Sequence, residues 1–192
     1  VTFKAQTVET GAEWELSNGL GSIRWAAPEI TFSKKLEIHW EANPMLLEYH
    51  PGPSTGAIWA NLPEEKVLFL GDAVVPAAPP FLASADIATW KETLALLSTP
   101  AFRNYTLISG RGGVVTHEQV KEQVHFLDKV EHQLEKIGNS PALSEIDKAV
   151  SQLLKSFEAP ADRMTHYALR LRWGLQHYIN NHLHASQELS EE

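Results

Sequence analysis

The stretch Glu48–Gly56 reads EYHPGPSTG and the stretch Val67–Asp72 reads VLFLGD, and these two segments decide how the fold is interpreted. An apolar run leads to His50 in the first segment and to Asp72 in the second. If the two runs are neighbouring strands of one sheet, both side chains emerge at the same edge. Imidazole and carboxylate are ligands of zinc, iron and manganese, so both residues are candidate metal ligands. The alternative is that both are solvated or structural residues at strand ends.

The composition is that of one globular domain. The chain has 192 residues, of which 43% are hydrophobic, and this is enough for a single hydrophobic core. The net charge of -8 argues against non-specific binding to nucleic acid or to an anionic membrane, since both need an excess of Lys and Arg. No apolar run approaches the roughly 20 residues that span a bilayer. We therefore expect neither nucleic acid nor a membrane among its partners.

Cysteine is absent from the sequence, which excludes disulfides and thiolate metal sites. Any metal site must therefore use His, Asp or Glu side chains. A chain without cysteine suits a reducing cytosol, and we expect a cytoplasmic location. The sequence begins with Val1 and contains methionine only at Met45 and Met164, so we expect a processed product or a fragment.

The first part of the chain has the pattern of strands and turns. Short apolar or alternating runs are separated by Gly, Pro and Asn, and the best strands are 31–39, 45–49, 57–60, 67–70 and 105–108. A tight connection makes 57–70 a hairpin. The succession of strand, helix and strand up to residue 108 predicts a layered α/β arrangement.

One helix is expected between the last two of these strands. Ser84 is the candidate N-cap and Pro100 ends the helix. Its apolar residues recur at helical spacing; they are Ile87, Trp90, Leu94 and Leu97.

After residue 115 the sequence becomes helical. Thr116 and Gln119 form a capping-box pattern, and Gly138 ends the helix that they begin. Ser140-Pro141 starts a second helix, because proline is tolerated at the first helical position.

A third helix is expected over about residues 162–184, followed by a frayed acidic tail from Ser186. Several of its residues are suited to an interface with another chain: Tyr167, Leu171, Leu175, Tyr178 and Ile179.

Taken in order, these segments resemble the metallo-β-lactamase superfamily over roughly residues 23–137. His50–Gly56 resembles the family's third-histidine motif, and the strand ending at Asp72 resembles the one that carries its metal-bridging aspartate. The Pro79-Pro80-Phe81-Leu82 segment and the Trp90 helix are similar to the family's next segment. Ile108–Gly113 stands where the family has a strand ending in Pro-Gly-His-Gly.

Two features depart from the family pattern. The His-x-His-x-Asp-His motif of the family's first half does not occur, and too few residues precede His50 to hold that half. Arg111 stands at the position of the last histidine ligand, and a guanidinium is not a metal ligand. It could bind an anionic substrate group, or it could pair with a nearby carboxylate. His50 and Asp72 alone are too few for a tight metal site.

The resemblance implies an α/β (α+β layered) fold, namely half of a metallo-β-lactamase αββα sandwich with C-terminal helices. The expected parts are a family-like region 1–138, a helical extension 139–185 and a frayed tail 186–192. The implied function is part of a metal-dependent hydrolase, inactive alone, with zinc as its metal and iron or manganese as alternatives. The other hypothesis is a non-catalytic remnant or assembly subunit.

The same reasoning predicts the partners. An uncovered half-sandwich should form a homo-oligomer or bind the missing N-terminal half. The parent family acts on small-molecule substrates. The remaining histidines are expected to be solvated or at an interface, including His125 and His132 on one helix and the tract of His177, His182 and His184.

Overall fold

The structure, a computed structural model, describes residues 29–39, 43–138 and 141–188, with side chains in the last helix described up to residue 181. Contacts divide the chain into two units, 1–32 and 33–192. All the helices and strands described below lie in the second unit.

The second unit contains one mixed sheet. Its strands are β1 (Lys35–His39), β2 (Pro44–Tyr49), β3 (Ile58–Leu62), β4 (Val67–Gly71), β5 (Thr106–Ser109) and β6 (Gly113–Val115). They lie in the order β1-β2-β3-β4-β5-β6. All neighbouring pairs are antiparallel except β4 and β5, which are parallel because helix α2 lies between them in the chain.

The strand predictions are confirmed in position, with changes at the ends. The predicted hairpin 57–70 is the antiparallel pair β3 and β4. The strand predicted to begin at Thr31 begins at Lys35 instead. Strand β6 was not predicted, because its three residues are too short to show a periodic pattern.

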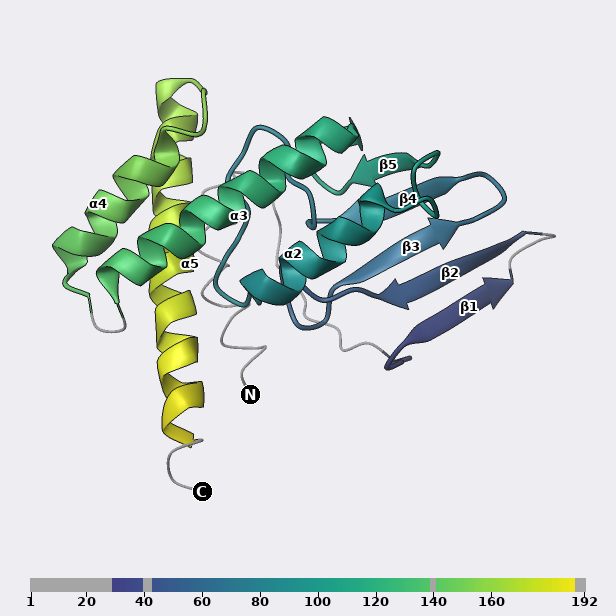
Figure 1. The fold of residues 1–192 in the computed structure, drawn as a ribbon, viewed down its shortest axis with the longest axis horizontal. Coiled ribbons are helices and arrows are strands. Elements are labelled where there is room, and N and C mark those ends of the chain that lie inside the picture. Colours follow the sequence, from purple (N-terminus) through teal and green to yellow (C-terminus); the bar gives the residue numbers. More distant parts are fainter. Residues whose placement is uncertain (1–28, 40–42, 139–140, 189–192) are drawn as a thin grey trace, which may run out of the picture. The chain divides into compact units, whose positions relative to one another are not determined.

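One face of the sheet forms the main core with two helices. Figure 1 shows α2 and α3 lying across the same face of the sheet. Five apolar side chains on this face are almost fully buried: Trp59, Leu68, Leu70, Leu107 and Val115. The helices meet them with Trp90, Leu94 and Leu127, none of which is exposed.

The opposite face carries an apolar row across the whole sheet. The register places six residues side by side on it, one from each strand: Leu36, Leu47, Ala60, Phe69, Ile108 and Val114. Register partners point to the same face of a sheet. Phe69 is 42% exposed and Val114 is 67% exposed, whereas the other four residues are half-buried, so this apolar face remains accessible at Phe69 and Val114.

Helix α2 (Ile87–Ala95) begins after a different cap from the one predicted. The N-cap is Asp86, whose carboxylate accepts from the backbone nitrogen of Thr89 at 3.0 Å. The prediction of Ser84 as the cap is therefore wrong. A tertiary contact explains why the helix begins after Asp86: the backbone nitrogen of Asp86 donates to the carbonyl of Gly52 at 2.9 Å. A short 3-10 helix, η1 (Leu96–Ser98), continues α2 before Pro100.

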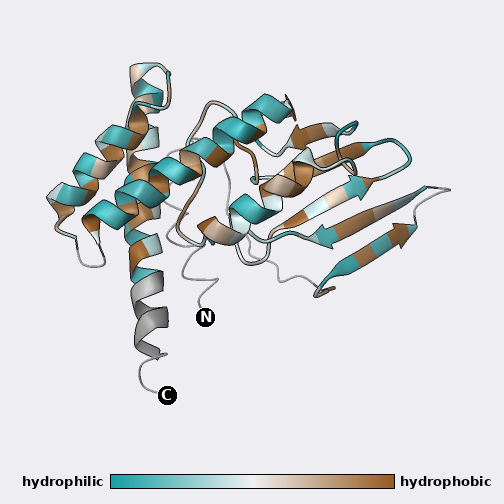
Figure 2. Ribbon diagram, in the orientation of Figure 1, coloured by the Kyte–Doolittle hydropathy of each residue, from teal (hydrophilic) through white to brown (hydrophobic). Residues whose placement is uncertain are grey.

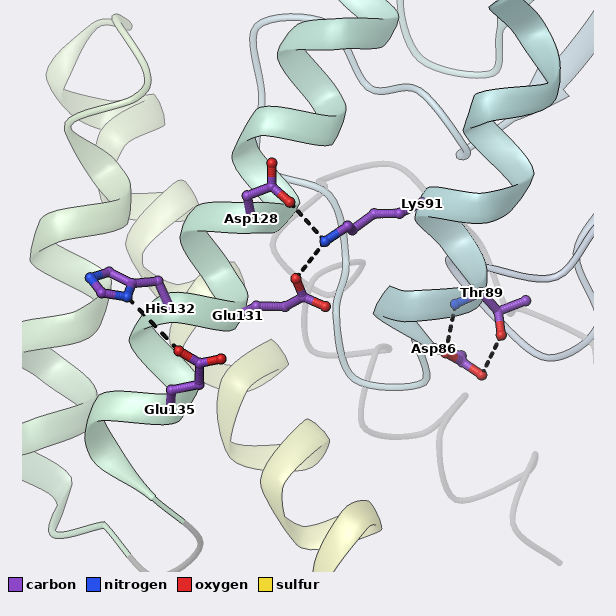
Figure 3. A network of polar contacts seen from close by, with 7 residues as sticks. All are labelled: Asp86, Thr89, Lys91, Asp128, Glu131, His132 and Glu135. Atoms are coloured by element: carbon purple, nitrogen blue, oxygen red, sulfur yellow. Dashed lines mark hydrogen bonds and ion pairs between the residues drawn. The ribbon is translucent and has the colours of Figure 1, made fainter. Parts of the chain in front are cut away.

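Helix α3 (His117–Ile137) has the predicted ends: Thr116 and Gln119 form a capping box, and Gly138 is the C-cap with a φ of 66°. Figure 2 shows hydrophilic and hydrophobic bands alternating along this helix. In Figure 3, Lys91 of α2 lies between two carboxylates of α3, at 2.8 Å from Asp128 and 2.6 Å from Glu131. Hydrogen bonds to these carboxylates raise the pKa of Lys91 above its ordinary value.

Helix α4 (Leu143–Leu154) contacts both α3 and α5 (Ala161–Glu188), and α5 runs obliquely to α4 in Figure 1. Pro141 precedes α4 instead of standing at its first position, and the Ser140 part of that prediction lies outside the described residues. Helix α5 extends four residues beyond the predicted His184.

Three residues predicted to form an intermolecular interface lie in the chain's own core. Leu171 and Leu175 are fully buried, and Ile179 is 7% exposed. An amphipathic stripe needs a partner surface, and here α4 and the segment after β4 supply it. Within the described residues, no helix combines the length and the apolar character that crossing a bilayer requires.

Candidate functional site

His50 follows β2 and lies on the helix-covered face of the sheet. Glu48 pairs in register with Trp59, so the residue two positions later is on the same face and lies over the indole. The rings of His50 and Trp59 stack with centroids 4.0 Å apart and an interplanar angle of 27°. Burial lowers the pKa of His50, and the Glu48 carboxylate opposes part of this effect. The imidazole is therefore neutral at pH 7, which is the protonation state of a metal ligand.

Asp72 lies in the turn that follows β4. Gly71 before it has a φ of +57°, a conformation that glycine adopts without strain. The Asp72 carboxylate lies 2.8 Å from Nε of Arg111. Arg111 thus forms an ion pair with a nearby carboxylate, which was one of the two roles predicted for it. The two side chains are 39% and 48% exposed, so this ion pair contributes little stability.

The ends of β4 and β5 are joined by backbone contacts that bring Asp72 and Arg111 together. The nitrogen of Gly110 donates to the carbonyl of Gly71 at 2.8 Å. Ser109 donates its hydroxyl to the carbonyl of Val74 and accepts from the nitrogen of Arg111. A Cβ at Gly110 would lie 3.3 Å from the Asp72 carboxylate, so a side chain there would press on the pair.

The strands that end at His50 and Asp72 are not neighbours, because β3 lies between β2 and β4. The expectation of adjacent strands is therefore wrong. Both strands run antiparallel to β3, so they end at the same edge of the sheet, as predicted. Two strand spacings separate their backbones by roughly 10 Å.

Trp90 connects the two loops across that distance. Its ring faces the backbone of Gly52, where a Cβ would lie only 2.8 Å away. Its indole nitrogen donates to the carbonyl of Ala73 at 3.0 Å. Thr93, one turn later, donates its hydroxyl to the carbonyl of Pro51. The sequence indicated Trp90 only as a core residue; the glycine-rich run 50–56 was the signal for such a close approach.

The described residues do not fit a metal site by themselves. They contain no group of three His, Cys, Asp or Glu side chains able to hold a metal ion. Asp72 has a cation as its neighbour, and His50 stacks on Trp59. The buried Nε1 of Trp59 has no hydrogen-bond partner among the described residues, but it is a donor and not a metal ligand. The assignment of a metal to His50 and Asp72 stays a prediction.

The remaining histidines add no such site within the described part of the chain. His132 lies 4.0 Å from Glu135 on the same helix (Figure 3), a carboxylate neighbour that the sequence analysis did not identify. His125 is exposed at the side of α3. The ring of His177 lies 6.0 Å from that of Trp173. The side chains of His182 and His184 are outside the described residues.

No protein-family profile matches this sequence, and no curated protein is significantly similar to it. Solved structures are similar to it. A metallo-beta-lactamase family protein from Thermus thermophilus has a TM-score of 0.56 and 15% identity, with 92% of this chain and 60% of that chain covered.

Two further similar structures cover less of the fold. A metallo-beta-lactamase from Pontibacter korlensis has a TM-score of 0.47 and 18% identity, over 64% of this chain and 55% of that chain. The metallo-beta-lactamase FIM-1 from Pseudomonas aeruginosa, in its mono-zinc form, has a TM-score of 0.41 and 21% identity, over 53% of this chain and 46% of that chain.

The likeness to the Thermus protein establishes the fold. The described part of the chain has the mixed sheet and helix layer of a metallo-β-lactamase fold, as the sequence predicted. The chain spans 55% and 60% of the length of the Pontibacter and Thermus proteins. At 15% identity, the likeness says nothing of activity.

The contact between Gly52 and Trp90 gives a stability prediction. We expect Gly52→Ala to lower the free energy of unfolding by about 1–3 kcal/mol, because its methyl group overpacks the buried indole. The matched control is Gly56→Ala in the same loop, since a Cβ there meets nothing within 4 Å. We expect it to change the free energy of unfolding by no more than about 0.5 kcal/mol. Urea unfolding measures both, and equal losses in the two variants would show that the indole does not set the loop.

The pair of Asp72 and Arg111 gives a metal-binding prediction. We expect Arg111→Ala to bind zinc about tenfold more tightly than the unaltered chain, because the change removes a cation and frees a carboxylate. Arg103→Ala is the control, since it removes the same charge from an exposed position. Zinc titration calorimetry measures the affinities. The same gain in both variants, or a gain that persists after His50→Ala and Asp72→Ala, would place the bound zinc elsewhere.

Proposed function

We propose that this chain is one half of a metal-dependent hydrolase of the metallo-β-lactamase superfamily and is inactive alone. The observation that carries the proposal is the accessible apolar face of the sheet. A single-layer sheet with helices on only one face exposes apolar residues to water, and an αββα sandwich buries such a face against a second sheet about 10 Å away.

Further exposed apolar residues on this face support the proposal that it contacts a partner. Tyr49 and Ile58 are register partners, and they are 41% and 40% exposed. Phe69 and Val114 extend the accessible surface across β4 and β6. Apolar side chains gathered on one face mark an interaction surface more often than scattered ones do. We propose that the occupant is the complementary half of the sandwich, and that a second copy of this chain occupies the face when that half is absent.

The chain's contribution to the site would be His50, Asp72 and Arg111. His50 and Asp72 would be two ligands of a zinc ion, with iron or manganese as alternatives, and the other half would supply the remaining ligands. Arg111 would bind an anionic group of a small-molecule substrate that carries an ester, thioester, amide or phosphoester bond. A chain without cysteine suits a reducing compartment, so we keep the cytoplasm as its proposed location.

One observation favours the alternative of a non-catalytic assembly subunit. The Arg111 guanidinium already neutralises the Asp72 carboxylate at 2.8 Å, at the position where the family resemblance places a metal ligand. A chain that retained the fold for assembly would need no metal there. The two proposals share the same sheet interface and differ in whether metal is bound at the strand ends.

The hydrolase proposal predicts the following assay result. We expect the purified chain, with or without added zinc, to show no turnover of ester, lactam or phosphodiester substrates, because its described residues lack a complete ligand set. Reading the gene upstream of the Val1 codon separates the two proposals: a His-x-His-x-Asp-His sequence there supports the hydrolase, and its absence supports the assembly subunit. Turnover by the isolated chain that disappears in His50→Ala would contradict the claim of inactivity.

The sheet interface predicts self-association of the purified chain at micromolar concentration. We expect Phe69→Lys to weaken that association by about tenfold or more, because it places a charge in the centre of the apolar face. Leu143→Lys is the matched control: Leu143 is an equally apolar residue, 59% exposed on α4 and away from the sheet. Sedimentation equilibrium measures the association constants. An unaltered chain that stays monomeric would overturn the prediction.

A further inference from the structure

A cavity of about 330 Å³ lies between the segment that follows β4 and helix α3. Its walls come from residues 75–80, from α3 and from the turn after α4. It is built entirely from described residues of the second unit. Its volume is at the lower end of the range for small-molecule sites. Neither the proposed hydrolase nor the assembly role uses it.

The first wall is held in place by contacts on both sides. Gln123 accepts from the backbone nitrogen of Val75 at 3.1 Å, and the hydroxyl of Tyr167 donates to the carbonyl of Ala77 at 3.2 Å. Ala77 has a φ of 56°, which is unusual for a residue with a side chain. Proline rings at Pro76 and Pro80 restrict the backbone further. The cavity is therefore preformed, because its wall has little freedom to collapse.

One buried donor in the lining lacks a partner. Gln123 is only 5% exposed, and its Oε1 is occupied by the bond from Val75. That bond fixes the orientation of the amide, so the other atom is Nε2, an N–H donor. Nε2 is buried and has no hydrogen-bond partner among the described residues. Because Nε2 itself is shielded from the cavity, Gln123 serves to hold the wall at Val75.

A positive charge stands in the same lining. Lys129 is partly buried, and its Nζ donates to the hydroxyl of Ser156 at 3.0 Å. An ammonium has three donors, and Lys129 forms no ion pair with a carboxylate of the described residues. The other titratable groups of the lining are the exposed Glu122 and His125. The half-buried ammonium of Lys129 thus favours an anion.

Phe126 and Phe157 give the lining an apolar part, beside the polar side chains of Gln119, Glu122, His125 and Ser156. The rings of Phe126 and Phe157 meet edge to face with centroids 5.0 Å apart, and Phe157 meets Tyr167 in the same way. Aromatic and proline rings suit a flat apolar group. A ligand that matches the ammonium and the aromatic rings has a carboxylate at one end and a small apolar body at the other.

We propose that this cavity binds a small organic carboxylate. Lys129 donates to the carboxylate oxygens, and the rings of Phe126 and Phe157 contact the apolar body. A charge-assisted hydrogen bond is stronger than a neutral one, so the anion should be preferred over a neutral amide of the same shape. This inference does not depend on the proposed function, because no residue of the strand-end site takes part.

The test compares benzoate with benzamide, two ligands of the same shape that differ in charge. Each is titrated into the full chain and followed by calorimetry at low salt. We expect benzoate to bind at least about tenfold more tightly than benzamide. We also expect Lys129→Met to remove that preference and Lys121→Met to keep it, since Lys121 is an exposed residue of the same helix that does not line the cavity.

The comparison of the two ligands on the unaltered chain decides the matter even if Lys129→Met fails to fold. Equal affinities for benzoate and benzamide, or no binding of either at millimolar concentration, would overturn the proposal. So would an equal loss of benzoate binding in the two lysine variants, because the effect would then be one of net charge.

Discussion

The buried indole of Trp90 is the contact on which the geometry of the strand-end site depends. It is not exposed at all, its ring leaves no room for a side chain at Gly52, and its nitrogen holds the carbonyl of Ala73. One side chain of α2 therefore positions two loops whose strands are separated by β3. Backbone pairing alone would leave these loops free to diverge, because β2 and β4 are not hydrogen-bonded neighbours in the sheet.

Among the described elements, α2 and α3 cover one face of the sheet, and Phe69 on the other face is 42% exposed. Lys91 of α2 lies between two carboxylates of α3, and these two helices form the layer that carries Trp90. This helix layer buries Trp59, Leu68 and Leu107. It does not cover the side chain of Phe69, which points to the opposite face of the sheet. Because side chains alternate along a strand, a sheet with apolar residues on both faces needs two covers. This is the physical reason for our proposal that a partner covers the second face.

The sequence predicted the positions of the helices and strands better than it predicted the contacts between them. Alternation and turn residues located five of the six strands, and the Thr116 and Gln119 pair located the start of α3. The choice of Asp86 over Ser84 depended on a hydrogen bond to Gly52, which no local pattern contains. Leu171 and Leu175 were assigned to an interface because a stripe on a helix shows that it is buried, but not against what. The same limit applied to Trp90, whose spacing indicated burial and nothing more.

The residue types of the candidate site were predictable from the sequence, but the ion pair between Asp72 and Arg111 was only one of two predicted alternatives. A histidine and an aspartate after two apolar runs indicate one sheet edge, and the fold places them there. The arginine at residue 111 changes what that edge can do. A carboxylate beside a metal cation and a carboxylate beside a guanidinium both have their charge neutralised, but only the first leaves an open coordination position for chemistry. The pair of Asp72 and Arg111 joins the turns that follow β4 and β5, and Gly110 and Ser109 join the same two turns through Gly71 and Val74. Any metal bound at this edge must therefore displace the guanidinium from Asp72 or share the carboxylate with it.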